Sequence, residues 1–567
     1  MKQICEMLPS IRTFFTVFLT LFCLLPAKVL SAEGRHDHSA HSAHLSGDVP
    51  LVDGLVDLGF AITTDNPKAQ EYFNQGLVLS YGFDHADAEV SFLKAAELDP
   101  QAAMAYWGAA FVLGPNINAP MDDAAVPRAY DLVKKALELS GSATEKEQAL
   151  IRALAERYAP EARADRSSLD RAFAEAMGQV YQRYPDDPDV AVLYAESLMD
   201  LHPWNYWTGD DQAQPWTPQI EAVLEKVIAE HPGHPHGHHL YIHLLENSPK
   251  PEATVKSADI IRNLVPAAGH LVHMAGHGYY AAGLYHDCSV VNEEAIGVDK
   301  VLKSSFDTSG LYQLAYMPHN LHFLLASYMM EGRSKDAVTA ARSLAAGVDT
   351  EQMRQPGLGS LQQFYLTPYY ALVRFGFWDE ILAEPAPPAD LKYPTAMWHY
   401  ARGMAFTRKG DLQKAREELA RLKETADDPE LEEMKIWDLN KVTDLLGIAS
   451  EVLEGEVAAA GGDDQAALSH FEKGVTIQDR LAFDEPPTWY YPVRQSLGAQ
   501  LFRIGRIHEA EEVFRKDLLK NAENPYALFG LAQCLKAQDK PLEAEEAERR
   551  FRRAWSRADV EMKRPVF

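Results

Sequence analysis

The sequence predicts an all-α protein built as a solenoid of helix–turn–helix repeats, and two observations lead to this prediction. From about residue 67 to residue 558, amphipathic stretches of 12 to 15 residues alternate with short turns, and strand-like alternation is scarce. In addition, one turn signal recurs along the chain, a glycine followed five residues later by a small residue. Recurrence of this kind is typical of stacked helical hairpins.

The turn signal occurs in five copies, and in a sixth copy Asp539 replaces the glycine. The copies are Gly283/Cys288, Gly332/Ala337, Gly410/Ala415, Gly462/Ala467, Gly505/Ala510 and Asp539/Ala544. The last two copies are 34 residues apart, whereas the interval from Gly283 to Gly332 is 49 residues. We therefore expect repeats of irregular length.

The first hairpin shows what lies inside a repeat: small residues where two helices approach, aromatic residues that fill the gap, and a closing proline. These residues are Gly76, Tyr81, Ala88, Phe92, Ala95 and Leu98-Asp99-Pro100. The pattern resembles the tetratricopeptide repeat (TPR), a helix–turn–helix unit of 34 residues. The resemblance implies a right-handed α-solenoid of TPR-like repeats, whose first helices line a concave groove. It does not indicate a function, because this scaffold serves many.

The chain is expected to divide into four parts. Residues 1–32 read as a cleaved signal peptide, with an apolar stretch from Phe14 to Leu25, so we expect a periplasmic or secreted protein. Residues 33–60 read as a disordered arm, which is either a segment whose histidines bind metal loosely or simply a solvated leader. Residues 61–383 and 384–567 read as two sets of repeats, separated at a proline-rich segment. The histidines of the arm are His36, His38, His41 and His44.

Charge and cysteine content exclude several classes of protein. The chain of 567 residues has 54 Lys and Arg against 82 Asp and Glu, a formal charge of −28, which disfavours nucleic-acid binding. No apolar run after the signal is long enough to span a membrane. Only Cys288 and Cys534 follow the signal, and both are expected to be small core residues rather than a disulfide framework.

Histidines are concentrated in one part of the sequence and recur in register. Of 21 histidines, 12 lie within residues 231–322. His270, His273 and His277 are spaced three and four apart, so one helix face presents all three. The same pattern occurs 34 residues earlier, at His236, His239 and His243. The interval between the turn glycines Gly283 and Gly332 is 49 residues, and 49 residues after His270 and His273 stand two further histidines. These equivalent residues are His236, His239, His243, His319 and His322.

The register predicts a metal site with one or two ions in the groove. The histidines fall between the packing positions of their helices, and such positions line the groove, as the TPR resemblance implies. Imidazole-rich sites suit copper or zinc, and Met329 near the last histidines would favour copper. Glu246 and Tyr280 lie three residues after His243 and His277, on the same helix faces. We take Glu246 as a candidate general base or geometry-setting ligand and Tyr280 as a candidate catalytic residue.

Several stretches also resemble a group of exported, histidine-rich bacterial TPR proteins. They are Tyr81-Gly-Phe-Asp-His85, Ala105-Tyr-Trp-Gly108, Gly114-Pro-Asn-Ile-Asn118, Gly269-His-Leu-Val-His273, Pro318-His-Asn-Leu-His322 and Trp489-Tyr-Tyr-Pro-Val-Arg494. The resemblance implies fold and location and brings no established activity, so no catalytic residue follows from it.

Three functions are compatible with these features. A metalloenzyme would act on a small substrate, by oxidation with copper or by hydrolysis with zinc. A metal storage or delivery protein would pass ions between the arm and the groove. A protein-interaction scaffold would use the groove for a protein partner, with histidines as polar contacts. In addition, the Trp-rich segment 201–218 reads either as a lid over the groove or, more simply, as a packing loop between repeats.

Overall fold

The computed structural model describes residues 49–56, 58–306 and 308–566. The described residues belong to one compact unit. The predicted signal peptide and the four histidines of the arm lie outside the described residues. Within the last part of the predicted arm, Val49 and Phe60 are buried. The Tyr72 hydroxyl donates a hydrogen bond to the Val49 carbonyl oxygen, so this part of the chain packs on the first helix.

Helices make up nearly all the regular structure of the described residues. The helices of the first half are α1 (Pro67–Tyr81), α2 (His85–Leu98), α3 (Ala103–Phe111), α4 (Val126–Leu139), α5 (Glu145–Ala155), α6 (Ser167–Arg183), α7 (Pro188–Met199), α8 (Thr217–Glu230), α9 (Pro235–Leu245), α10 (Val255–Leu264), α11 (Gly269–Ala281), α12 (Tyr285–Ser305), α13 (Met317–Glu331) and α14 (Ser334–Gly347). Those of the second half are α15 (Gln362–Tyr365), α16 (Thr367–Phe375), α17 (Trp378–Ala383), α18 (Lys392–Arg408), α19 (Leu412–Ala426), α20 (Val442–Ala460), α21 (Asp464–Gln478), α22 (Arg494–Arg503), α23 (Ile507–Lys520), α24 (Pro525–Ala537) and α25 (Pro541–Ala554).

Shorter elements connect these helices. A two-stranded antiparallel ribbon joins β1 (Lys435–Ile436) to β2 (Asn440–Lys441) before α20. A π-helical turn, Tyr312–Tyr316, leads into α13. The 3₁₀ turns are Asp123–Ala125, Ser140–Ser142, Pro251–Thr254, Gln352–Arg354, Gly359–Leu361 and Pro429–Leu431.

The predicted turn signals coincide with hairpin turns. The glycine of each copy has a left-handed backbone, with φ between 72° and 83°, which glycine adopts without a steric penalty. Asp539 takes the same conformation at φ 56°, so the sixth copy is also a turn. The glycines are Gly283, Gly332, Gly410, Gly462 and Gly505.

The packing inside a hairpin follows the TPR pattern. Phe92 of α2 fills the space left by two glycines, Gly76 of α1 and Gly108 of α3. A Cβ atom added at either glycine would lie 2.8 Å or 2.4 Å from the Phe92 ring. Phe514 is held in the same way between Gly498 and Gly530. The predicted all-α solenoid of TPR-like repeats is therefore confirmed.

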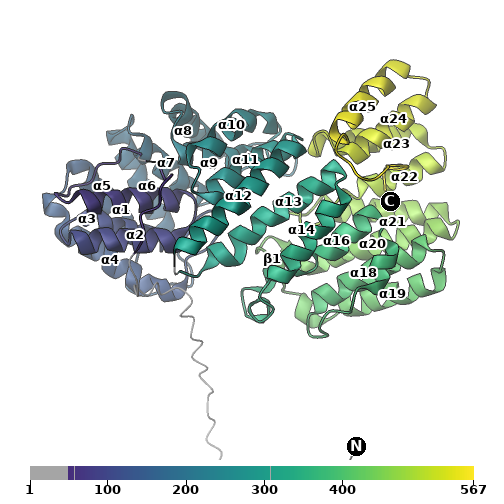
Figure 1. The fold of residues 1–567 in the computed structure, drawn as a ribbon, viewed down its shortest axis with the longest axis horizontal. Helices are drawn as coiled ribbons and strands as arrows, with labels where there is room; N and C mark the ends of the chain where they lie inside the picture. The colour runs from purple at the N-terminus through teal and green to yellow at the C-terminus, as the bar shows by residue number, and fades with distance from the viewer. Residues whose placement is uncertain (1–48, 57, 307, 567) are drawn as a thin grey trace, which may run out of the picture. The chain divides into compact units, whose positions relative to one another are not determined.

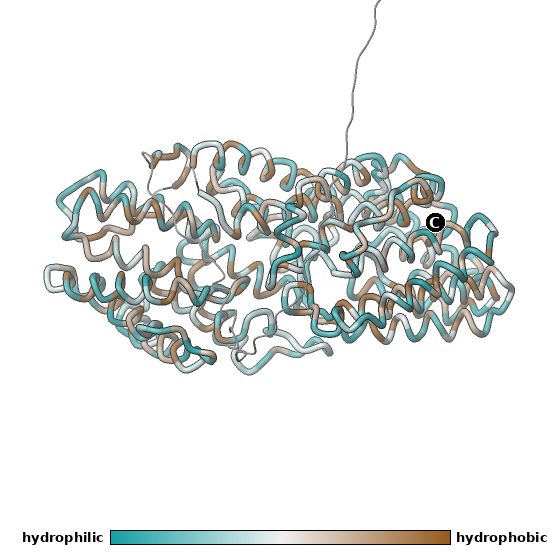
Figure 2. The backbone as a smooth tube through the Cα atoms, turned by 90° about the horizontal axis from the view of Figure 1, so that it is seen from below, coloured by the Kyte–Doolittle hydropathy of each residue, from teal (hydrophilic) through white to brown (hydrophobic). Residues whose placement is uncertain are grey.

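The hairpins α9–α10, α11–α12 and α13–α14 follow one another in the middle of the stack (Figure 1). Their first helices are neighbours, because α11 contacts both α9 and α13. Hydrophobic residues recur along the helices throughout the stack (Figure 2), and they form several buried clusters rather than one core. Cys288 and Cys534 are buried free thiols, as expected.

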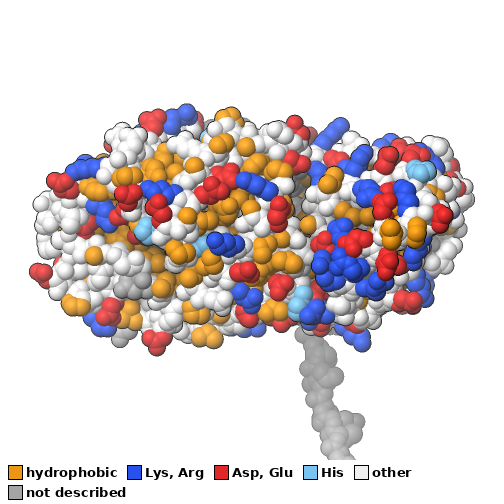
Figure 3. Space-filling view, turned by 90° about the horizontal axis from the view of Figure 1, so that it is seen from above, with side chains coloured by type: hydrophobic (Ala, Val, Ile, Leu, Met, Phe, Trp, Pro, Cys, Tyr) orange, Lys and Arg blue, Asp and Glu red, His pale blue; other side chains and the backbone are white. Residues whose placement is uncertain are grey.

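The face of the molecule drawn in Figure 3 carries many charged side chains and few histidines. On the face drawn in Figure 3, acidic and basic side chains are interspersed and histidine side chains occur singly. Among the described residues, we find no helix of the length and apolarity needed to cross a bilayer.

Candidate metal centre

The histidines of α9, α11 and α13 lie side by side in the interior of the stack. Residues three and four apart share a helix face, so each helix presents its histidines to the neighbouring helix. Ring centroids of adjacent histidines on different helices are close: 5.1 Å between His239 and His270, 5.1 Å between His243 and His277, and 5.0 Å between His273 and His319. The predicted register therefore brings six imidazoles of three hairpins together.

Six of these histidines form two groups of three. In each group, one nitrogen or more of each ring lies within 4.8 Å of the others, a spacing that suits a shared metal ion. We call His239, His243 and His270 the first triad, and His273, His277 and His319 the second triad. The two triads share helix α11, and the rings of His243 and His277 bring them into contact.

In the second triad, the Nε2 atoms converge. His277 Nε2 lies 2.8 Å from His273 Nε2 and 3.4 Å from His319 Nε2. Two nitrogens bound at about 2.0–2.1 Å to one tetrahedral ion would lie about 3.3 Å apart. The three rings are therefore already close to the geometry that a single zinc or copper ion requires.

A hydrogen bond fixes the tautomer of His273. Its Nδ1 atom lies 2.6 Å from Asn292 Oδ1, and the Asn292 amide is oriented by Nδ2, which donates to the Cys288 carbonyl oxygen at 2.8 Å. Nδ1 must therefore carry the proton, and Nε2 presents a lone pair to the other two rings. A hydrogen-bonded Nδ1 and a free Nε2 are the usual arrangement of a metal-ligating histidine.

In the first triad, the nitrogens that face one another have no hydrogen-bond partner. His239 Nδ1 donates to the Tyr81 carbonyl oxygen at 2.8 Å, which leaves a lone pair on Nε2. The Nε2 atoms of His239 and His243 and both ring nitrogens of His270 are buried and unpaired. Each unpaired buried group costs about 1–3 kcal/mol. A metal ion bound to this triad would remove that cost, so the residues fit the predicted ion.

Burial keeps these imidazoles neutral, which is the form that binds metal. Burial, with a further contribution from neighbouring histidines, lowers the pKa of five of them well below its usual value of 6.5. The histidines with this shift are His239, His243, His270, His273 and His319.

Two carboxyl groups lie against both triads. Glu246, the residue that ends α9, contacts His243 Nδ1 through Oε1 and His277 Nδ1 through Oε2, both at 2.8 Å. Glu485 comes from the loop before α22, and its Oε1 lies 3.1 Å from His277 Nδ1. Burial and the neighbouring Glu485 raise the pKa of Glu246 well above its usual value.

The structure places Glu246 beside the histidines rather than in a separate catalytic position. It contacts the outer nitrogens of two histidines and thereby orients both rings, as partners of metal-ligating histidines do. Sequence reasoning missed Glu485 and Asn292. Glu485 lies in a loop far along the chain, and Asn292 lies on the second helix of its hairpin, so neither belongs to a histidine pattern.

Besides Glu246, four predicted residues lie outside the two triads. His236 precedes the first triad by one helical turn, stacks on Tyr81 and directs Nε2 to Glu196 Oε2 at 3.3 Å. The His322 ring packs on Phe364 instead. Met329 is ten residues beyond His319, about 15 Å along α13, and it packs in an apolar cluster. The Tyr280 ring packs on Tyr285 and Phe323.

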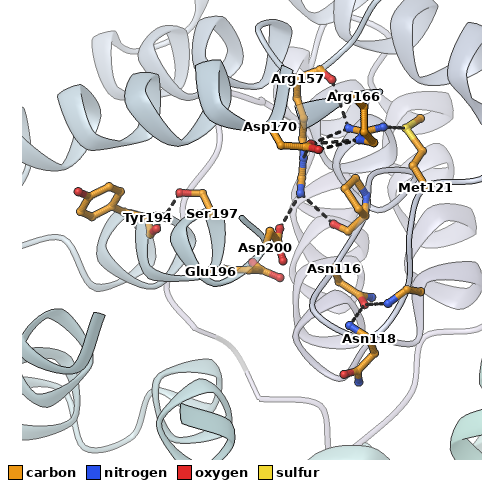
Figure 4. Close-up of polar contacts among 12 residues, drawn as sticks. Asn116, Asn118, Met121, Arg157, Arg166, Asp170, Tyr194, Glu196, Ser197 and Asp200 are labelled. Carbon is orange, nitrogen blue, oxygen red and sulfur yellow. Dashed lines mark hydrogen bonds and ion pairs between the residues drawn. The ribbon is translucent and has the colours of Figure 1, made fainter. Parts of the chain in front are cut away.

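Glu196, the residue that His236 faces, lies beside the buried ion pair of Arg157 and Asp200 (Figure 4). Glu196 and Asp200 are one turn apart at the end of α7, and Asp200 Oδ2 accepts a hydrogen bond from Arg157 at 2.6 Å. Burial raises the pKa of Glu196 to about 7. Ionisable residues therefore extend from the histidines of α9 into the N-terminal hairpins.

The Trp-rich segment 201–218 lies against α9. The ring of Trp204 packs edge-on against His243, with centroids 5.2 Å apart, and Trp207 Nε1 donates to the Leu244 carbonyl oxygen at 2.7 Å. Phe483, from the same loop as Glu485, contacts Trp204. This segment therefore covers the first triad from one side.

A further histidine–carboxylate group lies near the surface of the second half. It consists of Glu451, Glu454 and His470 from α20 and α21. Each side chain is 20–23% exposed, and Glu454 is also paired with Lys423. Exposed acidic groups of this kind are common without a bound ion.

Comparison with known proteins finds only distant structural alignments. No protein-family model matches this chain, and no curated protein matches it in sequence. The human IFIT1 dimer with m7Gppp-AAAA aligns at a TM-score of 0.33 and 13% identity, covering 84% of this chain and 95% of that chain. The APC/C hetero-tetramer Cut9–Hcn1 aligns at 0.27 and 12% identity, covering 87% and 88%. On the packing of its own hairpins, the chain is a TPR-like helical-repeat protein with two histidine triads.

Proposed function

We propose that the protein binds two transition-metal ions, copper or zinc, one in each histidine triad. The observation that carries this proposal is the convergence of Nε2 atoms on three neighbouring helices, with outer nitrogens bound to Asn292, Glu246 and the Tyr81 carbonyl. Neutral imidazole is a preferred ligand of both metals. Calcium and magnesium prefer oxygen ligands and are disfavoured here.

We further propose that the loaded centre is a metalloenzyme for a small substrate. Three protein ligands leave a position of a four-coordinate ion open for water or substrate, which distinguishes catalytic from structural zinc sites. A copper-loaded centre would oxidise the substrate, and a zinc-loaded centre would hydrolyse it. Glu246 would hold the rings of His243 and His277 and exchange protons with them.

Storage or delivery of the metal is the second candidate. Burial of the triads favours it, because His239 and His273 are fully shielded from solvent and an ion there would be retained. An exported protein with a histidine-bearing arm would suit this role, and export is part of the proposal. A protein-interaction scaffold is the third candidate, since the helical-repeat fold serves protein partners in many systems.

Metal analysis of the purified full chain tests the proposal. We expect about two ions per chain after dialysis in the wild type, and about one in His270→Ala and in His273→Ala. His238→Ala is the matched control, because this buried histidine of α9 is bonded to Ser257 and Pro232 and lies outside both triads. Equal metal content in all four proteins would refute the proposal.

The same preparations separate the candidate functions. A paramagnetic resonance signal identifies copper, and oxygen consumption with reducing substrates would support an oxidase. A hydrolase would act only in its zinc form. Release of the ion to an apo acceptor protein without turnover of any substrate would favour storage or delivery.

A further inference from the structure

A third group of possible metal ligands lies next to the two triads. His243, Glu246, His277 and Glu485 each offer a ligand atom within 4.8 Å of the others. Glu246 Oε1 and Oε2 contact the Nδ1 atoms of the two histidines, and Glu485 Oε1 lies 3.1 Å from His277 Nδ1 and 3.6 Å from His243 Nδ1. We call these four residues the carboxylate group.

The carboxylate group touches both triads through shared rings. His243 belongs to the first triad and His277 to the second, and each directs Nδ1 to the carboxylates. The other nitrogen of each ring, Nε2, lies on the side of its triad. An ion held by the carboxylates is therefore one imidazole ring away from either triad.

Solvent contact differs within the group. The side chains of His243 and His277 are 1% exposed and that of Glu246 is 2% exposed, whereas Glu485 is 11% exposed. In addition, Glu485 Oε2 has no hydrogen-bond partner, although the atom itself is buried. Glu485 thus reaches from the solvent side of the centre to the histidines.

A buried metal centre must be loaded from a hydrated ion. Removing the waters from a divalent cation in one step costs far more than exchanging them one at a time for oxygen ligands. Carboxylates compensate the charge during this exchange, and imidazoles then bind copper or zinc more firmly than carboxylates do. The formal charge of −28 also raises the concentration of cations near the surface.

We propose that Glu485 and Glu246 form a loading position, at which a divalent transition-metal ion binds in transit before it passes to the histidine triads. This inference rests on the proposed function. In this proposal Glu485 increases the rate at which metal is loaded but is not a ligand of the finally bound ions, because each triad already supplies three imidazoles. The ion keeps its charge during transfer, and waters leave as imidazole nitrogens replace them.

The experiment compares loading rate with final metal content. Metal-free full-length protein is mixed with Zn²⁺ held by a coloured indicator, and the colour change follows the transfer of zinc. We expect Glu485→Gln to load roughly tenfold more slowly than the wild type and to reach the same two ions per chain. Glu451→Gln is the matched control, because Glu451 also bonds a histidine Nδ1, at 2.7 Å, away from the triads.

Each outcome decides a separate question. Equal rates for Glu485→Gln and the wild type would overturn the loading position, and so would a lower final metal content of Glu485→Gln, which would make Glu485 a resident ligand. Failure of the wild type itself to take up zinc or copper would instead refute the proposed function. Circular dichroism of the metal-free variants checks that both remain folded.

Discussion

Asn292 Oδ1 accepts a hydrogen bond of 2.6 Å from Nδ1 of His273, and this contact determines which nitrogen of His273 faces the second triad. We expect Asn292→Ala to weaken metal binding at this triad by about 10–100-fold, the usual effect of removing such a partner. Asn292→Asp keeps an acceptor and should bind more tightly than Asn292→Ala. Competition with a chelator of known affinity measures the difference. Equal affinity of Asn292→Ala and the wild type would contradict this assignment.

Glu246 differs from Asn292 because it contacts a histidine of each triad. Glu246→Ala should therefore weaken the binding of both ions, whereas Asn292→Ala should weaken the binding of one. Two-site titration of each variant by calorimetry distinguishes these patterns. A single weakened site in Glu246→Ala would show that its bond to one of the two histidines has no influence on metal binding.

The metal-free protein should lose stability as the pH falls below about 6.5, the usual pKa of histidine. Five histidines have folded-state pKa values well below this, so the unfolded chain takes up protons first. Above pH 6.5 these histidines are neutral in both the folded and the unfolded chain, and the protein is most stable. Below pH 6.5 the free energy of unfolding falls by up to about 1.4 kcal/mol per pH unit for each histidine. Melting temperatures measured from pH 8 to pH 5 test the trend.

Bound metal should shift the pH at which the protein loses stability. An ion that binds only the folded state stabilises it by about 2.7 kcal/mol at a free concentration of 100 times Kd. Because protons compete with the ion for the same nitrogens, the melting temperature of the loaded protein should stay high to a lower pH and then fall more steeply. Identical pH profiles with and without metal would argue against ligation by these histidines.

The hairpin packing predicts a stability effect without an effect on the metal. A Cβ atom at Gly108 would lie 2.4 Å from the Phe92 ring, so Gly108→Ala should cost about 1–3 kcal/mol. Gly141→Ala is the control, because nothing lies within 4 Å of its Cβ position. Denaturant unfolding gives the comparison, and both variants should keep the wild-type metal content. A neutral Gly108→Ala would mean that Phe92 moves aside freely.

The sequence was informative where a local pattern repeats. Helical spacing predicted that His270, His273 and His277 share one face, and the glycine turns marked the hairpins. The interval of 49 residues predicted both His319 and His322 at the centre, because it carries no information on how α13 is rotated after the π-helical turn Tyr312–Tyr316. The structure places His319 in the second triad and His322 beside Phe364.

Residues that meet only through tertiary packing gave no signal in the sequence. Glu485 reaches the centre from a loop between α21 and α22, and its position depends on how the later hairpins fold back on α9 and α11. Met329 was associated with the histidines by helix face alone, without the distance along the helix axis. The domain boundary at residue 384 and the export of the protein stay predictions.

The position of Glu246 between His243 and His277 has a consequence for how the two ions influence each other. An ion on His243 Nε2 makes the Nδ1 proton of that ring more acidic and so favours the ionised carboxylate. The ionised carboxylate in turn makes His277 a stronger donor to the second ion. Occupancy of one triad should thus promote occupancy of the other, and the pair should fill cooperatively, with a coupling that is reciprocal by thermodynamic necessity.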